Sequence, residues 1–162
     1  MLENSNIYSI TITLDSKDIK SKNINQLLKY KLKTKLENKC GTHGYVKKDS
    51  VKIIQRSYGK FKLIDNRCVL LYDIIYSIDS IYPLKSDILE CVISNSTKMG
   101  CIAYMEHKNE EYTLKTSPLL IIIPMNYIER EYKPNERINV EVITSKIKYN
   151  AKQIQVIAKP ID

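Results

Sequence analysis

The chain has 162 residues, enough for one ordinary domain or two small ones, and 43% of them are hydrophobic, which excludes wholesale disorder. Its net charge of +8 is concentrated in residues 1–81, which carry +7, whereas residues 82–162 carry +1. A basic first half indicates a polyanionic partner or an acidic protein surface. Only four of the 26 basic residues are arginine, however, and a lysine-rich composition can also arise without any ligand.

No apolar run approaches the roughly 18 residues that span a bilayer, and residues 1–6 lack the basic start and apolar stretch of a signal peptide. The sequence therefore predicts an intracellular chain with no membrane segment. Four cysteines occur far apart, without a CxxC pair: Cys40, Cys68, Cys91 and Cys101. Because metal-site spacing is absent, we expect reduced thiols that pack as small hydrophobic side chains.

The first half has the pattern of a small α+β unit. Residues 8–14 alternate apolar and hydroxyl side chains, which predicts a half-buried strand. Residues 24–36 repeat leucine and isoleucine at helical spacing, with lysines on the remaining faces. Three residues are available as helix caps: Ser21, Asn23 and Asn25. The lysine-rich helix face is more typical of a solvated surface than of a ligand site, and both interpretations stay open.

The helix should end at a glycine-rich turn that contains Gly41 and Gly44, two of the chain's four glycines. One or two strands follow within residues 45–54, and the almost continuous apolar run at 68–78 predicts a central strand covered on both sides. Residues 79–86 break the pattern. We place the domain boundary there, with an N-terminal domain at 1–80 and a C-terminal domain at 81–162.

Beyond the boundary the sequence predicts five short strands: 88–94, 100–105, 119–123, 137–144 and 153–158. Five strands in about 75 residues without a long helix predict a small barrel, for which the OB fold is the commonest architecture. The expected fold class is therefore α+β followed by all-β, with a strand–helix–strands domain preceding a five-stranded OB-type barrel.

The sequence offers little for catalysis. Acid–base chemistry would depend on His43 or His107, no serine or cysteine lies in a nucleophile elbow, and no glycine loop could cradle phosphate. Glu106, Glu110 and Glu111 flank His107, which permits a metal cluster but is more typical of a solvated loop. We therefore expect no enzyme activity, no metal and no cofactor.

Twelve tyrosines and the basic composition admit a stacking surface for single-stranded nucleic acid, the usual ligand of an OB barrel. Four residues are weak candidates for this contact: Lys98, Tyr104, Lys146 and Lys148. Tyr104, just after the turn at Gly100, is the best placed of them. Its alternative role is that of an ordinary barrel tyrosine with its hydroxyl group in water.

Collinear segments carry a resemblance: IYSITITL, LKTKLENKCGTHGYV, CVLLYDIIYSI, YPLKSDILECVISNSTKMG and RINVEVITSKIKYNAKQIQVIA. In this order they resemble the first strand, tip, crossing strand, hinge with first barrel strand, and last two barrel strands of the stalk subunit of multi-subunit DNA-directed RNA polymerases. This is the seventh-subunit family of eukaryotes, with archaeal and large-DNA-virus relatives. The likeness covers nearly the whole chain.

The resemblance implies a non-catalytic subunit whose N-terminal tip domain docks on the polymerase core while its OB domain lies near the RNA exit. The implied partners are the large RNA polymerase subunits, a second stalk subunit and nascent RNA. The implied location is the virion and host cytoplasm for a viral protein, or the nucleus for a cellular eukaryotic one. The enrichment in lysine, isoleucine and asparagine suits a large DNA virus with an AT-rich genome.

Carried over to this chain, the docking segment comprises Lys39, Cys40, Gly41, Thr42, His43, Gly44, Tyr45 and Val46. A glycine-bracketed turn permits close approach of a partner, and Tyr45 and Val46 would supply apolar anchors. The alternative is an ordinary helix-to-strand turn with Tyr45 packed inward.

Three departures from the family pattern weaken the expectation of RNA contact. Cys101, Ile102 and Ala103 replace an aromatic-rich segment, and residues 86–87 are Ser-Asp in place of Gly-Glu. The loop between the third and fourth barrel strands is also short. The near-neutral second half points the same way. The alternative function is therefore a free-standing OB-fold RNA-binding protein, such as a translation or RNA-processing factor.

Overall fold

The structure, a computed structural model, describes residues 3–20, 23–106 and 111–161. The chain divides into two compact units. We call one the sheet unit, which comprises Ser5–Glu37 and Val46–Ser80, and the other the barrel unit, which comprises Met1–Asn4, Asn38–Tyr45 and Ile81–Asp162. One junction therefore falls at the expected boundary, while the segment after the helix belongs with the barrel. No helix in the described ranges is long and apolar enough to cross a membrane.

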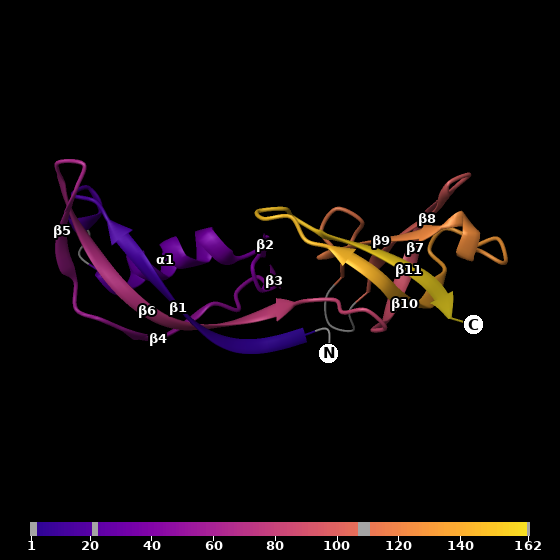
Figure 1. The fold of residues 1–162 in the computed structure, drawn as a ribbon, viewed down its shortest axis with the longest axis horizontal. Helices are drawn as coiled ribbons and strands as arrows, with labels where there is room; N and C mark the ends of the chain where they lie inside the picture. Colours follow the sequence, from indigo (N-terminus) through magenta and orange to yellow (C-terminus); the bar gives the residue numbers. More distant parts are fainter. Residues whose placement is uncertain (1–2, 21–22, 107–110, 162) are drawn as a thin grey trace. The chain divides into compact units, whose positions relative to one another are not determined.

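The sheet unit is an antiparallel sheet with a helix on one face (Figure 1). Its elements are β1 (Glu3–Leu14), the 3-10 helix η1 (Asp18–Lys20), α1 (Ile24–Leu36), β4 (Lys52–Arg56), β5 (Lys60–Ile64) and β6 (Arg67–Ile81). The long strand β6 organises the sheet, because β1 pairs along one side of it while β4 and β5 pair antiparallel along the other.

Helix α1 is bounded by Asn23 at its N-terminus and by Glu37 at its C-terminus. The Asn23 side chain accepts a hydrogen bond from the Gln26 amide at 3.2 Å, so Asn23 is the cap among the three predicted candidates. At the other end Glu37 is extended, and Asn38 has a φ of +57°, which turns the chain away from the helix axis. Leu28 and Leu32 point into the sheet and are fully buried in its core.

Two lysines of α1 are bound to carboxylates of the sheet unit. Lys31 pairs with Asp18, and Lys33 donates to Asp49 at 2.7 Å. The bond to Lys33 lowers the pKa of Asp49 and raises that of the lysine. Part of the lysine-rich face is therefore engaged within the chain, which leaves Lys29 and Lys35 as its exposed members.

The barrel unit contains a closed five-stranded barrel, which confirms the predicted architecture at this level. Its elements are β7 (Ile88–Thr97), β8 (Gly100–Met105), β9 (Leu119–Pro124), the 3-10 helix η2 (Met125–Tyr127), β10 (Arg137–Lys146) and β11 (Ile154–Ile161). The strand order is β10-β11-β9-β8-β7, with β11 and β9 parallel and the other pairs antiparallel. This is an OB-like arrangement.

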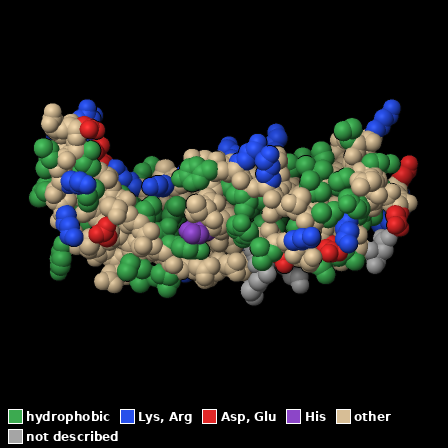
Figure 2. Space-filling model, in the orientation of Figure 1, with side chains coloured by type: hydrophobic (Ala, Val, Ile, Leu, Met, Phe, Trp, Pro, Cys, Tyr) green, Lys and Arg blue, Asp and Glu red, His purple; other side chains and the backbone are tan. Residues whose placement is uncertain are grey.

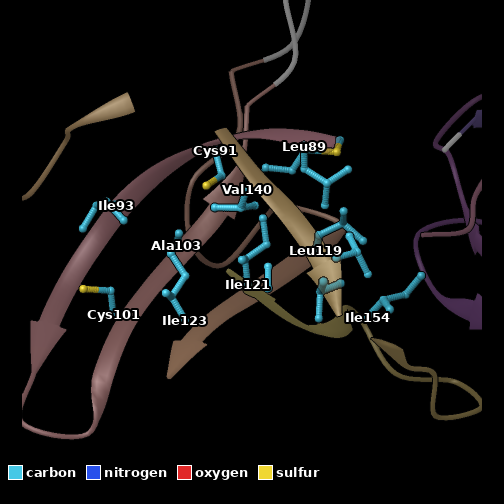
Figure 3. Packing of buried hydrophobic residues seen from close by; sticks show 14 of the residues in the cluster. Leu89, Cys91, Ile93, Cys101, Ala103, Leu119, Ile121, Ile123, Val140 and Ile154 are labelled. Atoms are coloured by element: carbon cyan, nitrogen blue, oxygen red, sulfur yellow. The ribbon is translucent and has the colours of Figure 1, made fainter. Parts of the chain in front are cut away.

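Alternate residues of every barrel strand point inward and fill the interior (Figure 3). Inward-pointing residues at the same level of the barrel form a layer. One layer consists of Ala103, Ile121 and Val156, which are register partners on neighbouring strands and are all fully buried. The layer combines a small side chain with two branched ones. This mixture fits the narrow interior of a five-stranded barrel.

Gly100 is required by the close packing of β8 against β9. Its φ is +138°, and a Cβ atom at this position would lie 2.2 Å from the carbonyl oxygen of Ile123. No side chain can be accommodated without moving the β9 backbone. The turn after β7 is therefore specified by this glycine.

We predict that Gly100→Ala lowers the free energy of unfolding by about 1–3 kcal/mol, through backbone strain and the clash with β9. Chemical denaturation of the full chain measures the loss. Gly41→Ala is the matched control, because a Cβ there meets no atom within 4 Å. Equal stability of the two variants would contradict the described β8–β9 packing.

Candidate functional site

The segment predicted to dock on a partner forms a short hairpin. Strands β2 (Cys40–Gly41) and β3 (Gly44–Val46) pair antiparallel, with Cys40 opposite Tyr45 and Gly41 opposite Gly44. Cys40 and Tyr45 are both buried, in the apolar cluster that includes the barrel interior. The hairpin therefore contributes side chains to the core of the barrel unit.

Backbone hydrogen bonds attach this hairpin to the connection between β10 and β11. The Cys40 amide donates to the Ala151 carbonyl at 2.8 Å, and the Asn150 amide donates to the Cys40 carbonyl at 2.9 Å. A buried strand needs partners for its polar backbone groups, and this pair of bonds supplies them for Cys40. The hairpin is held by main chain as well as by side chains.

Burial divides the eight predicted docking residues into two groups. Cys40, Gly44, Tyr45 and Val46 are buried, Lys39 and Gly41 are partly buried, and Thr42 and His43 are exposed. The two apolar anchors expected here, Tyr45 and Val46, are thus packed inside the chain itself, Tyr45 with the barrel core and Val46 with the sheet core. What the segment offers to a partner is its turn, Thr42 and His43.

Gly44 is placed where only glycine fits. Its φ is +93°, and a Cβ atom would lie 2.3 Å from the Ile81 carbonyl oxygen. A substitution here would disturb the hairpin before it tested any contact with a partner.

The barrel carries a second candidate surface on its outside. Across the strands, Tyr104 of β8 pairs with Leu120 of β9, Leu120 with Gln155 of β11, and Gln155 with Lys146 of β10. Register partners point to the same side of a sheet, so Tyr104 and Lys146 lie in one outward row, about 14 Å apart over three strand spacings. A neighbouring row adds largely aliphatic side chains: Ile102, Ile122, Ile157 and Thr144.

The other two predicted nucleic-acid residues lie elsewhere. Lys98 is in the β7–β8 turn beside Gly100, whose partner on β9 is Pro124. Pro124 is four residues from Leu120, so Lys98 is about 13 Å along the strands from the row of Tyr104. Lys148 is exposed in the β10–β11 connection, just beyond Lys146. The structure thus brings Tyr104 and Lys146 together, with Lys148 near them, and separates Lys98.

A third surface, on the sheet unit, was missed by sequence reasoning. All five residues of β5 are exposed, including Phe61 at 74% and Leu63 at 70%, and Tyr58 before it is exposed by 91%. A tight turn joins β5 to β6 through two residues with positive φ, Asp65 and Asn66. Figure 2 shows hydrophobic side chains, in green, at this end of the sheet unit, with lysine and arginine beside them.

Phe61 and Leu63 lie on the helix-covered face of the sheet, as their partners on β6 show. Phe61 pairs with Leu70, which is buried in the core of the sheet unit, and Leu63 pairs with Cys68, which is exposed. The apolar face of the sheet therefore continues from the core into an uncovered stretch. No pattern in the sequence pointed to this region, since exposed apolar residues do not produce a burial pattern.

The described residues show no arrangement for metal binding: no group of three histidine, cysteine, aspartate or glutamate side chains could hold an ion. Of the predicted loop cluster, His107 and Glu110 lie outside the described residues. Glu106 accepts from Arg137 at 2.6 Å. The buried serines Ser50 and Ser117 have structural partners. Ser117, for example, donates to the Leu119 carbonyl at 3.0 Å.

All four cysteines are free thiols, and three of them are buried as predicted, whereas Cys68 is exposed. Burial raises the pKa of Cys40 to about 11, and burial followed by the charge of Glu90 raises the pKa of Cys91 to about 12. Both thiols are therefore protonated and shielded at neutral pH, and are unreactive as nucleophiles.

We predict that iodoacetamide at about pH 8 modifies Cys68 in the native chain and spares Cys40 and Cys91, because only thiolates that reagent can reach are alkylated. Mass spectrometry of the digested protein measures each site, and the denatured chain, in which all four sites should react, is the control. Native-state modification of Cys40 at the rate of Cys68 would show that the hairpin does not pack into the barrel core.

Comparison with known proteins adds no family to this description. No protein-family model matches the chain, and no curated protein matches it significantly. The geometry of the three surfaces therefore carries the functional argument.

Proposed function

We propose that this chain is a non-catalytic subunit of a DNA-directed RNA polymerase, attached to the core enzyme through its sheet unit and presenting its OB-like barrel to other molecules. The order of parts supports the proposal. A strand, a capped helix, a short hairpin and an OB-like barrel follow one another as the resemblance to the polymerase stalk family implies.

The observation that carries the proposal is the uncovered apolar end of the sheet unit. Phe61, Leu63 and Tyr58 would each lose solvent-exposed apolar surface on contact with a partner. Large exposed apolar patches are rare on monomeric proteins, and aromatic side chains are enriched among the residues that dominate binding energy. A subunit that is permanently held in a larger assembly accounts for such a patch, whereas an independent soluble protein would be at risk of aggregation.

The turn of the β2–β3 hairpin is the second docking candidate, because Thr42 and His43 are the exposed part of the segment that resembles the family's tip. Gly44 and Tyr45 are unsuitable for testing this contact, since both are built into the barrel unit. Substitutions at exposed positions separate docking from folding.

We predict that a tagged full chain, expressed in its native source, co-purifies with the large subunits of an RNA polymerase. Phe61→Glu combined with Leu63→Glu should reduce this recovery at least about tenfold, because charges replace apolar contact residues at the interface. Thr42→Glu combined with His43→Glu tests the hairpin turn in the same way. Quantitative mass spectrometry of the purified material is the measurement.

Two controls fit these variants. Met99→Glu with Met125→Glu places the same charges at exposed apolar positions of the barrel unit, and Lys20→Glu matches the charge change of the turn variant. Both should retain the polymerase. Absence of polymerase subunits from the wild-type material would overturn the proposed function. Unchanged recovery with both docking variants would instead mean that the subunit binds through another surface.

The outward row on the barrel favours a second candidate, a free-standing RNA-binding protein. Tyr104 and Leu120 offer a stacking and apolar surface, and Lys146 a phosphate contact at its end. Few basic residues accompany them, however, and the barrel half of the chain has little net charge. We therefore rank this function second.

The second candidate makes a distinct prediction for the isolated chain. A fluorescein-labelled oligouridine should bind with an affinity that falls as salt rises, and Tyr104→Ala should weaken binding by about 1–3 kcal/mol, the usual loss for one stacked base. Fluorescence anisotropy measures both effects, with Tyr58→Ala, an exposed tyrosine of the sheet unit, as control. If Tyr104→Ala leaves the affinity unchanged, the row does not bind RNA.

A further inference from the structure

Strand β1 is an open edge of the sheet unit. Among the described strands its one neighbour is β6, so the backbone groups on its other side have no strand to pair with. The strand is 12 residues long and contains neither proline nor a basic residue, and its one charged residue is Glu3 at its start. Proteins usually protect long edge strands with proline or with lysine and other charged residues, because an unprotected edge pairs readily with another chain.

Helix α1 lies beside this edge, and a groove runs between them. Ile12 and its neighbours on β1 form one wall, and Tyr30, Lys31, Thr34 and Lys35 of α1 form the other. Tyr30 is 68% exposed, so its ring offers apolar surface to whatever enters the groove. An added strand would have hydrogen-bonding groups on one side and a helix surface under its alternate side chains.

The positive charge beside the groove indicates which kind of peptide could add to β1 as a further strand. Two lysines border it, of which Lys31 is paired with Asp18 while Lys35 has no ion pair among the described residues. Residues 1–81 as a whole carry a net charge of +7. A second copy of the chain would bring the same lysines against these, which opposes symmetric edge-to-edge pairing. An acidic strand is favoured by the same charges.

We propose that β1 is an acceptor edge for an extended acidic peptide segment of a partner protein, which adds to the sheet as a further strand beside α1. Main-chain hydrogen bonds to β1 provide the pairing, apolar side chains of the segment contact Tyr30, and carboxylates meet Lys35. This site goes beyond the polymerase docking proposed above and does not depend on it, since β1 borders β6 on the side opposite β5.

The test uses the full chain and a short blocked peptide in which valine and glutamate take turns at every second position, with threonine between them, so that both kinds of side chain face the helix. Hydrogen exchange followed by NMR should show slower exchange at every second amide of β1 when the peptide is present, because alternate residues of an edge strand face outward. A peptide with lysine in place of glutamate should not bind. The valine–glutamate peptide with alternate N-methylated residues should not bind either, because it keeps the charge but cannot complete the pairing.

Variants of the chain locate the contact. Lys35→Glu should weaken peptide binding by about fivefold or more, and Lys62→Glu on β5, the same change of charge elsewhere on the sheet unit, should not. The proposal is overturned if β1 amides are unaffected by the peptide, if the N-methylated peptide binds equally well, or if sedimentation shows that the edge is occupied by a second copy of the chain. None of these results bears on co-purification with a polymerase.

Discussion

The backbone pairing of Cys40 with the connection between β10 and β11 decides which residues this protein can offer to a partner. Two hydrogen bonds, to Asn150 and Ala151, fix the segment after α1 to the barrel unit. The pairing directs Cys40 and Tyr45 into the barrel core, leaving the turn at Thr42 and His43 as the exposed part of the hairpin. Most of the segment that was predicted to dock on a partner is therefore packed inside the chain.

Because the hairpin is packed into the barrel unit, a partner must bind mainly through other exposed surfaces. In the sheet unit these are the apolar stretch around Phe61 and the open edge of β1, both accompanied by lysines. In the barrel unit it is the outward row that begins at Tyr104. Each is a contact surface of apolar and basic groups, suited to binding a macromolecule. A subunit of a larger assembly accounts for all of them together.

Much of the fold could be predicted from the sequence, because burial leaves a periodic pattern. The helix at 24–36 and all five barrel strands were found this way, and the observed bounds differ mainly at strand ends: β6, for example, continues to Ile81 beyond the predicted 78. The expectation that this strand is covered on both sides was wrong, because burial alternates along β6 and Ile75 is 38% exposed. The attachment of the hairpin could not be found, since Cys40 and Ala151 are more than 100 residues apart and no local pattern links them.

The candidate surfaces were only partly predictable for the same reason. Tyr104 was singled out by its residue type, but its position in one row with Lys146 depends on the register of four strands. Phe61 and Leu63 gave no signal, because an exposed apolar residue in a hairpin has the same sequence pattern as a buried one. Register and exposure are properties of the whole sheet, and a short window of sequence does not contain them.

Native-state hydrogen exchange at two backbone amides tests the central constraint most directly. If the hairpin is part of the barrel core, the Cys40 and Asn150 amides should exchange only when the barrel opens, with protection comparable to that of Val156. Exchange of both amides as fast as that of an exposed loop, while Val156 stays protected, would contradict the account. The segment would then be free to bind a partner through Tyr45.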